Sequence, residues 1–248
     1  MCPLGVSANN QLNHIDEFLL DAGFPSHTID AMSDIQKGLI YEQSVGKIIG
    51  YGGESTQNFV LNDEQSLIEI DDSIQPCSGT ISSSDLTLSV ISTYTMDLDG
   101  NIEYYTVYPN FVWHKAVKVK NDSFSMTMYP GWEAIPQDEN FRLHLMNSNG
   151  DSAQYVDISP TGSGSAGYTY KVPSSVGILQ GMYEGYAYFS VEKTTSSASQ
   201  RITLHYVHDK SSSMNISYSI SIVNFSINLS SSNNNLNVMS GNYNINVI

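Results

Sequence analysis

The sequence predicts a mainly β protein, an antiparallel β-sandwich with a small N-terminal module of short helices. The first observation is a period of two near the end of the chain, where apolar residues alternate with Ser or Asn from Met214 onward. The second is a long succession of such runs, separated by polar turns, after Thr80. The third is that helical periodicity is confined to residues 10–43.

The N-terminal segment, residues 1–45, is predicted to hold three short helices. The first has an apolar face at Ile15, Phe18, Leu19 and Ala22. Gly23 is expected to end this helix, and Ser26 to cap a second one. Ser33 and Gln36 form a capping-box pattern that opens a third. Because three short helices bury little apolar surface, we expect them to dock on the sheet.

The next segment, residues 46–79, is rich in glycine and acidic residues and is interpreted as a connection. Within it, residues 59–61 and 68–70 are expected to form short strands.

The third segment, residues 80–248, is predicted to be the sandwich domain. Asp99-Gly100 lies between two alternating runs, which indicates a hairpin. The predicted strands cover residues 86–94, 102–108, 111–119, 123–129, 141–146, 168–172, 183–191 and 202–207. In the last stretch the apolar phase slips by one residue between Ile222 and Val223, which predicts a β-bulge or a tight corner between strands.

Composition narrows the range of partners. Charged residues are 14% of the chain, whereas disordered chains are usually rich in charge, so we expect a folded domain with a surface of Ser, Thr and Asn. The formal charge of -15 would repel a phosphate backbone, which excludes nucleic acid as the principal partner. We expect this charge to serve solubility.

No apolar run approaches the ~18 residues of a membrane-spanning helix, so no integral membrane segment is predicted.

The N-terminus and the cysteines leave alternatives open. Val6-Ser7-Ala8 resembles the small-residue end of a signal peptide, and we expect the chain to derive from a longer, exported precursor. Cys2 and Cys77 either form one disulfide or remain thiols.

Metal-site and catalytic patterns are weak. Asp97, Asp99, Asn101 and Glu103 place oxygen atoms at alternate positions around a glycine, as calcium loops do, although a plain hairpin turn explains them equally. His205 and His208 are three residues apart on a predicted strand and therefore point to opposite faces. The chain has no G-x-S-x-G motif, and no cofactor is predicted.

Aromatic side chains are the candidate ligand-binding residues. Tyr129-Pro130-Gly131-Trp132 is a turn that presents a large ring to solvent, which makes Trp132 the leading candidate. The remaining candidates are Tyr129, Trp113, Tyr186 and Tyr188. Such rings bind sugars or protein partners when they are exposed, and they fill the core when they are not.

The motifs FLLDAGFP (18–25), NDSFSM (121–126) and LHYVHDK (204–210), taken together, resemble uncharacterised secreted proteins of Gram-positive bacteria. This resemblance implies export and carries over no functional residue. We therefore expect a secreted or cell-surface bacterial protein, more plausibly a binding module than an enzyme, whose partner is an extracellular protein or glycan. A pore-forming protein is the first alternative, because segments 80–95 and 214–230 alternate like membrane strands. The second is a hydrolase that uses Glu133 and Asp138.

Overall fold

The computed structural model describes residues 8–61, 67–70, 85–117, 119, 121–147, 153–172, 181–209, 218–223, 226–231 and 236–244. Cys2 and Cys77 lie outside these residues, as do Val6 and Ser7 of the proposed cleavage motif.

Three helices lead into the sheets, as the sequence predicts: α1 (Ala8–Asp21), α2 (Ser26–Ala31) and α3 (Asp34–Ser44). Gly23 follows α1 with a φ of 85°, a left-handed conformation that glycine adopts without strain. The Ser33 side chain caps α3 by accepting a hydrogen bond from the backbone N–H of Gln36. The predicted cap on α2 is wrong. Pro25 occupies the extended capping position, and Ser26 is already the first helical residue.

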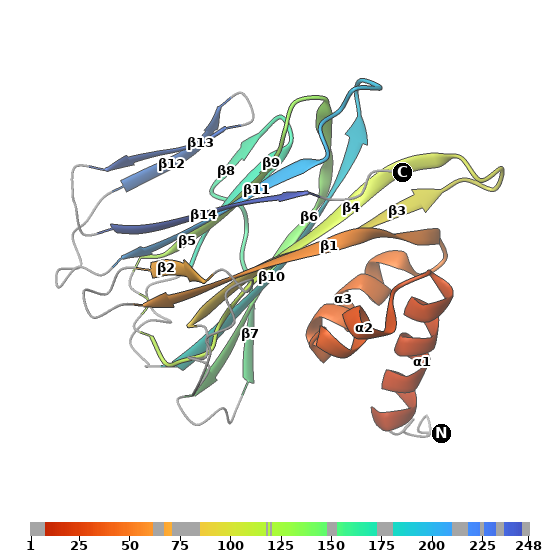
Figure 1. The fold of residues 1–248 in the computed structure, drawn as a ribbon, viewed down its shortest axis with the longest axis horizontal. Helices are drawn as coiled ribbons and strands as arrows, with labels where there is room; N and C mark the ends of the chain where they lie inside the picture. Colours follow the sequence, from red (N-terminus) through yellow and green to blue (C-terminus); the bar gives the residue numbers. More distant parts are fainter. Residues whose placement is uncertain are drawn as a thin grey trace.

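The larger sheet, called sheet A, has seven antiparallel strands in the order β2-β1-β3-β4-β10-β6-β7 (Figure 1). Its strands are β2 (Leu67–Ile70), β1 (Ile48–Leu61), β3 (Leu86–Met96), β4 (Ile102–Trp113), β10 (Gly181–Lys193), β6 (Trp132–Asn147) and β7 (Ala153–Asp157). The predicted hairpin at Asp99-Gly100 joins β3 to β4, which confirms that assignment.

The second sheet, called sheet B, has five strands in the order β14-β11-β5-β9-β8. Its strands are β14 (Leu236–Asn244), β11 (Arg201–Asp209), β5 (Ser123–Met128), β9 (Gly167–Lys171) and β8 (Gly162–Gly164). A separate hairpin consists of β12 (Tyr218–Val223) and β13 (Ser226–Ser231). β12 ends at Val223 and the antiparallel strand β13 begins at Ser226, so the phase slip of the sequence lies where one strand ends and its partner follows.

Within the segment interpreted as a connection, the described residues 48–61 and 67–70 belong to sheet A. The strands expected at residues 59–61 and 68–70 are present, but the first of them is the end of the fourteen-residue strand β1. β1 pairs with β3 along almost its whole length and bulges between Tyr51 and Gly53. Its glycines fit this pairing, because a Cβ on Gly50 would overlap the ring of Tyr94. The glycines that suggested a loop therefore allow close packing of side chains against a strand.

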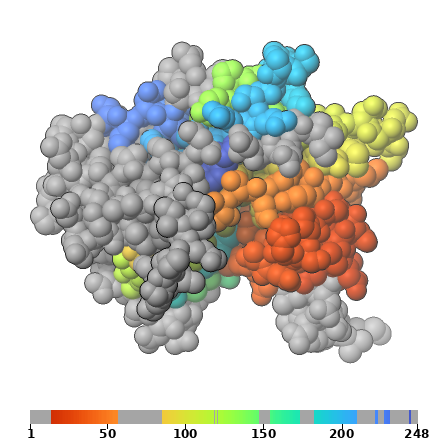
Figure 2. Space-filling view, viewed as in Figure 1, coloured from red at the N-terminus to blue at the C-terminus, as the bar shows by residue number. Residues whose placement is uncertain are grey.

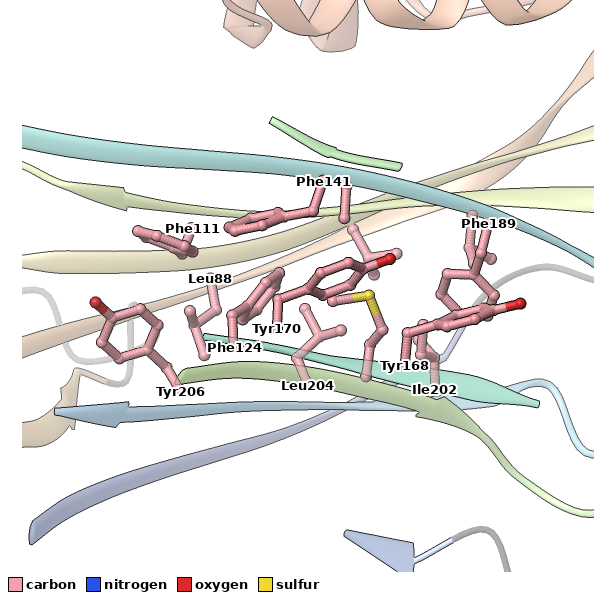
Figure 3. Close-up of a cluster of buried hydrophobic side chains, with 14 of the residues drawn as sticks. Leu88, Phe111, Phe124, Phe141, Tyr168, Tyr170, Phe189, Ile202, Leu204 and Tyr206 are labelled. Carbon is pink, nitrogen blue, oxygen red and sulfur yellow. The ribbon is translucent and has the colours of Figure 1, made fainter. Parts of the chain in front are cut away.

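The main core lies between sheets A and B, where aromatic and aliphatic side chains from both layers interlock (Figure 3). Alternation along the strands supplies this core. On β5, for example, Phe124, Met126 and Met128 face sheet A and are fully buried. The fold is thus a mainly β sandwich, as predicted.

A second core joins the helical module to the opposite face of sheet A (Figures 1 and 3). Leu19 and Ile40 of the helices pack with Ile91, Tyr108 and Tyr186 of the sheet. In the space-filling view the module forms a lobe against the sandwich (Figure 2). The prediction that the helices dock on the sheet is confirmed.

Among the described residues, no helix combines the length and the apolar character that crossing a membrane requires.

Candidate functional site

Alternation on β6 directs polar side chains toward the helices. Phe141 and Leu143 enter the main core, so Arg142 and His144 project from the other face of sheet A, where the helical module lies. Two cross-strand rows result from the register. Tyr155 of β7, His144 of β6 and Glu184 of β10 form one row, and Asp157, Arg142 and Tyr186 form the neighbouring row.

These side chains hold one another in place. Tyr155 stacks on His144, with ring centroids 4.7 Å apart and planes inclined by 10°. His144 Nδ1 lies 3.0 Å from Glu184 Oε2, and the Arg142 Nε–H donates to Asp157 Oδ1 at 2.9 Å. One face of the Tyr155 ring rests on the buried imidazole of His144. The ring is therefore held in place, although 53% of the residue is exposed.

A chain of hydrogen bonds continues from this cluster into the helical module. The Tyr186 hydroxyl donates to Glu184 Oε2 at 2.9 Å, and the Ser33 hydroxyl donates to the Tyr186 oxygen at the same distance. Ser33 is also the cap of α3. The start of α3 is therefore connected to β10 and, through Glu184, to His144 of β6.

Between α3 and the ends of β6 and β7 lies a pocket of about 220 Å³, which we call the junction pocket. It is lined by Asp34, Ile35, Gly38, Leu39, Glu42, Arg142 and Tyr155. Gly38 leaves it open, because a Cβ at this position would meet no atom within 4 Å. The volume is below the ~300 Å³ at which drug-sized sites begin, so the pocket suits one sugar ring or one side chain of a larger ligand.

Two groups of the cluster, Arg142 and Tyr186, hold their protons more tightly than usual. The hydrogen bond with Asp157 raises the pKa of Arg142 further above its already high value, so the guanidinium stays charged. Burial, followed by the nearby charge of Glu184, raises the pKa of Tyr186 and keeps its hydroxyl protonated. A fixed aromatic ring beside a guanidinium and carboxylates can stack on the apolar face of a sugar or side chain and bind its polar edge.

His144 contributes an unusual feature. Its Nε2 atom is buried and has no hydrogen-bond partner among the described residues, although only 7% of the residue is exposed. Buried polar atoms are normally paired, and an unpaired one requires an explanation. The His144 ring stacks on the Tyr155 ring, which borders the junction pocket.

The tryptophans predicted as ligand-binding residues are both in the main core. Trp132 is 1% exposed, so the expectation that its turn presents it to solvent is wrong. The segment after β10 folds over this turn, where the indole N–H donates to the Ser199 carbonyl at 2.6 Å and Gly131 lies against Ala198. Trp113 is equally buried and donates to the Tyr206 hydroxyl at 3.0 Å.

The predicted tyrosines lie in other places. Tyr186 and Tyr188 share a strand face, as expected, but that face packs against the helices. Tyr186 is buried and Tyr188 half-buried. Tyr129 is half-buried, with the Arg201 guanidinium carbon 6.0 Å from its ring centroid. The junction pocket includes none of the five predicted rings, and ligand binding by any of them stays a prediction.

The calcium candidates form a closed turn. The Asp97 carboxylate accepts from the backbone N–H groups of Asp99 and Asn101 and from the Asn101 side chain. These bonds lower the pKa of Asp97 and stabilise the turn. Calcium binding at this turn stays a prediction. Within the described residues, no group of three or more His, Cys, Asp or Glu side chains is placed to hold a metal ion.

The hydrolase candidates do not border the junction pocket. Glu133 is exposed opposite Glu192 of β10, and Asp138 lies in an irregular part of β6 beside Gln137, which has a φ of 65°. Sequence reasoning missed Arg142, His144 and Tyr155. The available signal was their period of two, which places Arg142 and His144 on the face opposite Phe141.

The chain matches no protein-family model and no curated protein. Solved structures with a limited likeness include ACE19, the collagen-binding subdomain of the Enterococcus faecalis surface protein ACE, at 10% identity and a TM-score of 0.34, covering 59% of this chain and 89% of that one. The collagen-binding domain of a Staphylococcus aureus adhesin gives 6% identity and a TM-score of 0.33, covering 57% and 87%. The C-terminal domain of the Streptococcus pyogenes antigen I/II-family protein AspA gives 10% and 0.31, covering half of each chain. At these values the likeness identifies neither a family nor a ligand.

Proposed function

We propose that this chain is an exported, non-enzymatic binding protein that holds one unit of an extracellular glycan or protein in the junction pocket. The observation that carries the proposal is the fixed and exposed ring of Tyr155 beside the Arg142 guanidinium. Exposed aromatic rings and arginines dominate the binding energy of protein surfaces. A ring that is already held by His144 loses little conformational entropy when a ligand binds.

The polar groups around the ring favour a ligand rich in hydroxyl or amide groups. Arg142 supplies charged N–H donors, and Glu42 and Asp34 supply carboxylate acceptors from the opposite wall. A purely apolar ligand would leave these groups without hydrogen bonds, which costs binding energy. Sugars present apolar C–H faces and hydroxyl edges together, and so do several amino-acid side chains.

Gly38 provides a test that separates binding from folding. Leucine at this position would fill the pocket, since no atom lies within 4 Å of the added Cβ. The same substitution should not weaken α3, because glycine in a helix costs about 0.5–1 kcal/mol relative to alanine. Gly38→Leu is therefore expected to abolish binding while leaving thermal stability equal or higher.

The measurement is binding of the fluorescently labelled chain to arrays of glycans and of extracellular-matrix proteins. We expect some array members to retain the unaltered chain, and Gly38→Leu and Tyr155→Ala to lose them. Leu98→Ala is the matched control, because Leu98 is 95% exposed on the turn between β3 and β4 and does not line the pocket. Retention that survives Gly38→Leu, or an array with no retained member, would refute the proposal.

A further inference from the structure

The outer face of sheet B, which points away from sheet A, is buried although its side chains are polar. All six residues of β5 are buried, and three of them, Ser123, Ser125 and Thr127, are on this outer face. A permanently covered face normally carries apolar side chains, whereas a face that meets water is not buried. The polar side chains of this face are therefore better suited to contact with water than to permanent burial.

Three side chains on this face form one row across three strands. His205 of β11 pairs with Ser125 of β5, and Ser125 pairs with Thr169 of β9. Their exposed fractions are 9%, 0% and 3%. The atoms His205 Nδ1, Ser125 Oγ and Thr169 Oγ1 are all buried without a hydrogen-bond partner among the described residues. Three unsatisfied polar atoms in one row lower the stability of the covered arrangement.

The β12–β13 hairpin lies against this face. β12 contacts β8 and β9, and β13 contacts β5. Ile222 sits so close over Gly164 that a Cβ on that glycine would be 2.9 Å from the Ile222 Cβ. In Figure 1 the two strands form a ribbon of their own beside sheet B. From Ser211 to Ile248 the sequence has no Asp, Glu, Lys or Arg, so no salt bridge from this segment holds the hairpin down.

His205 is a buried base without a charged neighbour on the strands around it. β5, β14, β12 and β13 contain no acidic or basic residue, and their titratable groups are Tyr218 of β12 and Tyr243 of β14. On β11 itself the titratable groups are Arg201, Tyr206, His208 and Asp209. Burial alone lowers the pKa of His205 to about 4 from its ordinary value of 6.5.

We propose that the β12–β13 hairpin is a reversible cover on sheet B, closed at neutral pH and released in acid when His205 takes up a proton. Release exposes the row to water, which supplies the missing hydrogen bonds of Ser125, Thr169 and His205. The open state thus binds a proton that the closed state excludes. This inference does not depend on the junction pocket.

The direction and size of the pH effect follow from the two pKa values. Neutral His205 favours closure fully above pH 6.5, and this preference is lost as the pH falls from 6.5 toward 4. The equilibrium then shifts toward the open state by up to about 300-fold, since each pH step of one changes it about tenfold. Below about pH 3, this group adds no further change.

Hydrogen exchange at pH 6.5 and pH 4, expressed as protection factors, tests the proposal. Amides of β12 and β13 are expected to lose up to about 80-fold in protection between these two pH values, while those of β5 keep theirs. In His205→Gln this acid-dependent loss should disappear. His27→Gln, which alters an exposed histidine of the helical module, should retain the loss. Equal losses in β12–β13 and β5, or a loss that persists in His205→Gln, would overturn the proposal.

A second pair of variants tests the proposed cover at neutral pH, without protonation of His205. Thr169→Val removes an unpaired hydroxyl and should raise the protection of β12 and β13 at neutral pH. Thr106→Val is the matched control in sheet A, where the Thr106 hydroxyl lies 2.8 Å from that of Ser190. It should destabilise the whole chain by leaving Ser190 unpaired. Lower hairpin protection in Thr169→Val would contradict a cover that lies on unsatisfied polar groups.

Discussion

Asp122 shows how a single buried charge is held in this fold. The residue is fully buried, and its carboxylate accepts hydrogen bonds from the Tyr206 hydroxyl at 2.8 Å and the backbone N–H of Asp209 at 3.1 Å. His208 Nδ1 lies 2.9 Å from the same carboxylate. The Tyr206 oxygen also accepts from the Trp113 indole, so this network connects sheet B to sheet A. A buried carboxylate with several partners is costly to disrupt, because each partner then loses its hydrogen bond.

We expect Asp122→Ala to lower the free energy of unfolding by about 3–5 kcal/mol, since it leaves His208 and Tyr206 without their acceptor. Asp157→Ala is the matched control. Its ion pair with Arg142 is exposed and should contribute less than about 1 kcal/mol. Urea unfolding of both variants measures the difference, and equal losses would refute the role assigned to Asp122.

The buried tyrosines predict a loss of stability in alkali. Burial, followed by the charge of Glu139, raises the pKa of Tyr168 to about 12, and burial also raises that of Tyr183 to about 12. A free tyrosine ionises near pH 10, so the unfolded chain releases these protons earlier than the folded chain. Stability should therefore fall as the pH rises from 10 to 12. Melting temperatures across this range provide the measurement, and Tyr168→Phe should fall less steeply than the unaltered chain.

Two serines at helix starts differ in function: Ser33 caps its helix, and Ser26 does not. Ser33 accepts from the Gln36 N–H at 3.2 Å and donates to Tyr186, whereas Ser26 makes no capping bond. Ser33→Ala should therefore cost about 1–2 kcal/mol, and Ser26→Ala close to nothing. Thermal unfolding of the two variants compares them directly. A larger loss for Ser26→Ala would contradict the observed helix boundaries.

The contact between β9 and β5 depends on a glycine. A Cβ on Gly167 would lie 2.2 Å from the Met126 carbonyl oxygen, which neither strand can accommodate without moving. Gly167→Ala is expected to destabilise the chain by about 1–3 kcal/mol. Gly162→Ala, on the neighbouring strand, meets nothing closer than 3.9 Å and should be tolerated. Chemical unfolding of the pair tests this, and an unchanged midpoint for Gly167→Ala would be inconsistent with the packing.

Local pattern accounts for much of this architecture. The alternation at residues 86–94 and 202–207 lies within β3 and β11, and Ser33 opens α3 as its capping box predicts. Residues 48–58 form a strand that was not predicted, because Gly50 and Gly52 resemble a loop, while their role is to let Tyr94 and Ser92 approach. Local sequence does not reveal which neighbour a glycine accommodates.

The candidate site was less accessible to sequence reasoning. Trp132 stands in a turn that looks exposed, but it packs in the main core and Ser199, far along the chain, lies against it. Tyr155 gains its role from stacking on His144, through a strand pairing that is not evident from either segment alone. Binding sites built from several elements depend on tertiary contacts, whereas strand periodicity does not.

At the scale of the whole molecule, the layers run from the helical module through sheet A and sheet B to the β12–β13 hairpin (Figures 1 and 3). The helices share their core with Ile91, Tyr108 and Tyr186 of sheet A. The Thr28 hydroxyl donates to the Glu54 carboxylate of β1 at 2.9 Å, which adds a polar contact between the same layers. Without the sheet, the helices would lose these apolar contacts. The junction pocket lies at this contact, so the proposed function requires the two parts to fold as one unit.

Equilibrium unfolding followed by two signals tests most directly whether the helical module and the sandwich unfold together. Circular dichroism at 222 nm follows the helices, and tryptophan fluorescence follows the sandwich, because Trp113 and Trp132 both lie in its core. The two signals are expected to change together, with the same midpoint in urea. Loss of the helical signal at a lower urea concentration, with the fluorescence unchanged, would show a module that folds separately and would contradict the account.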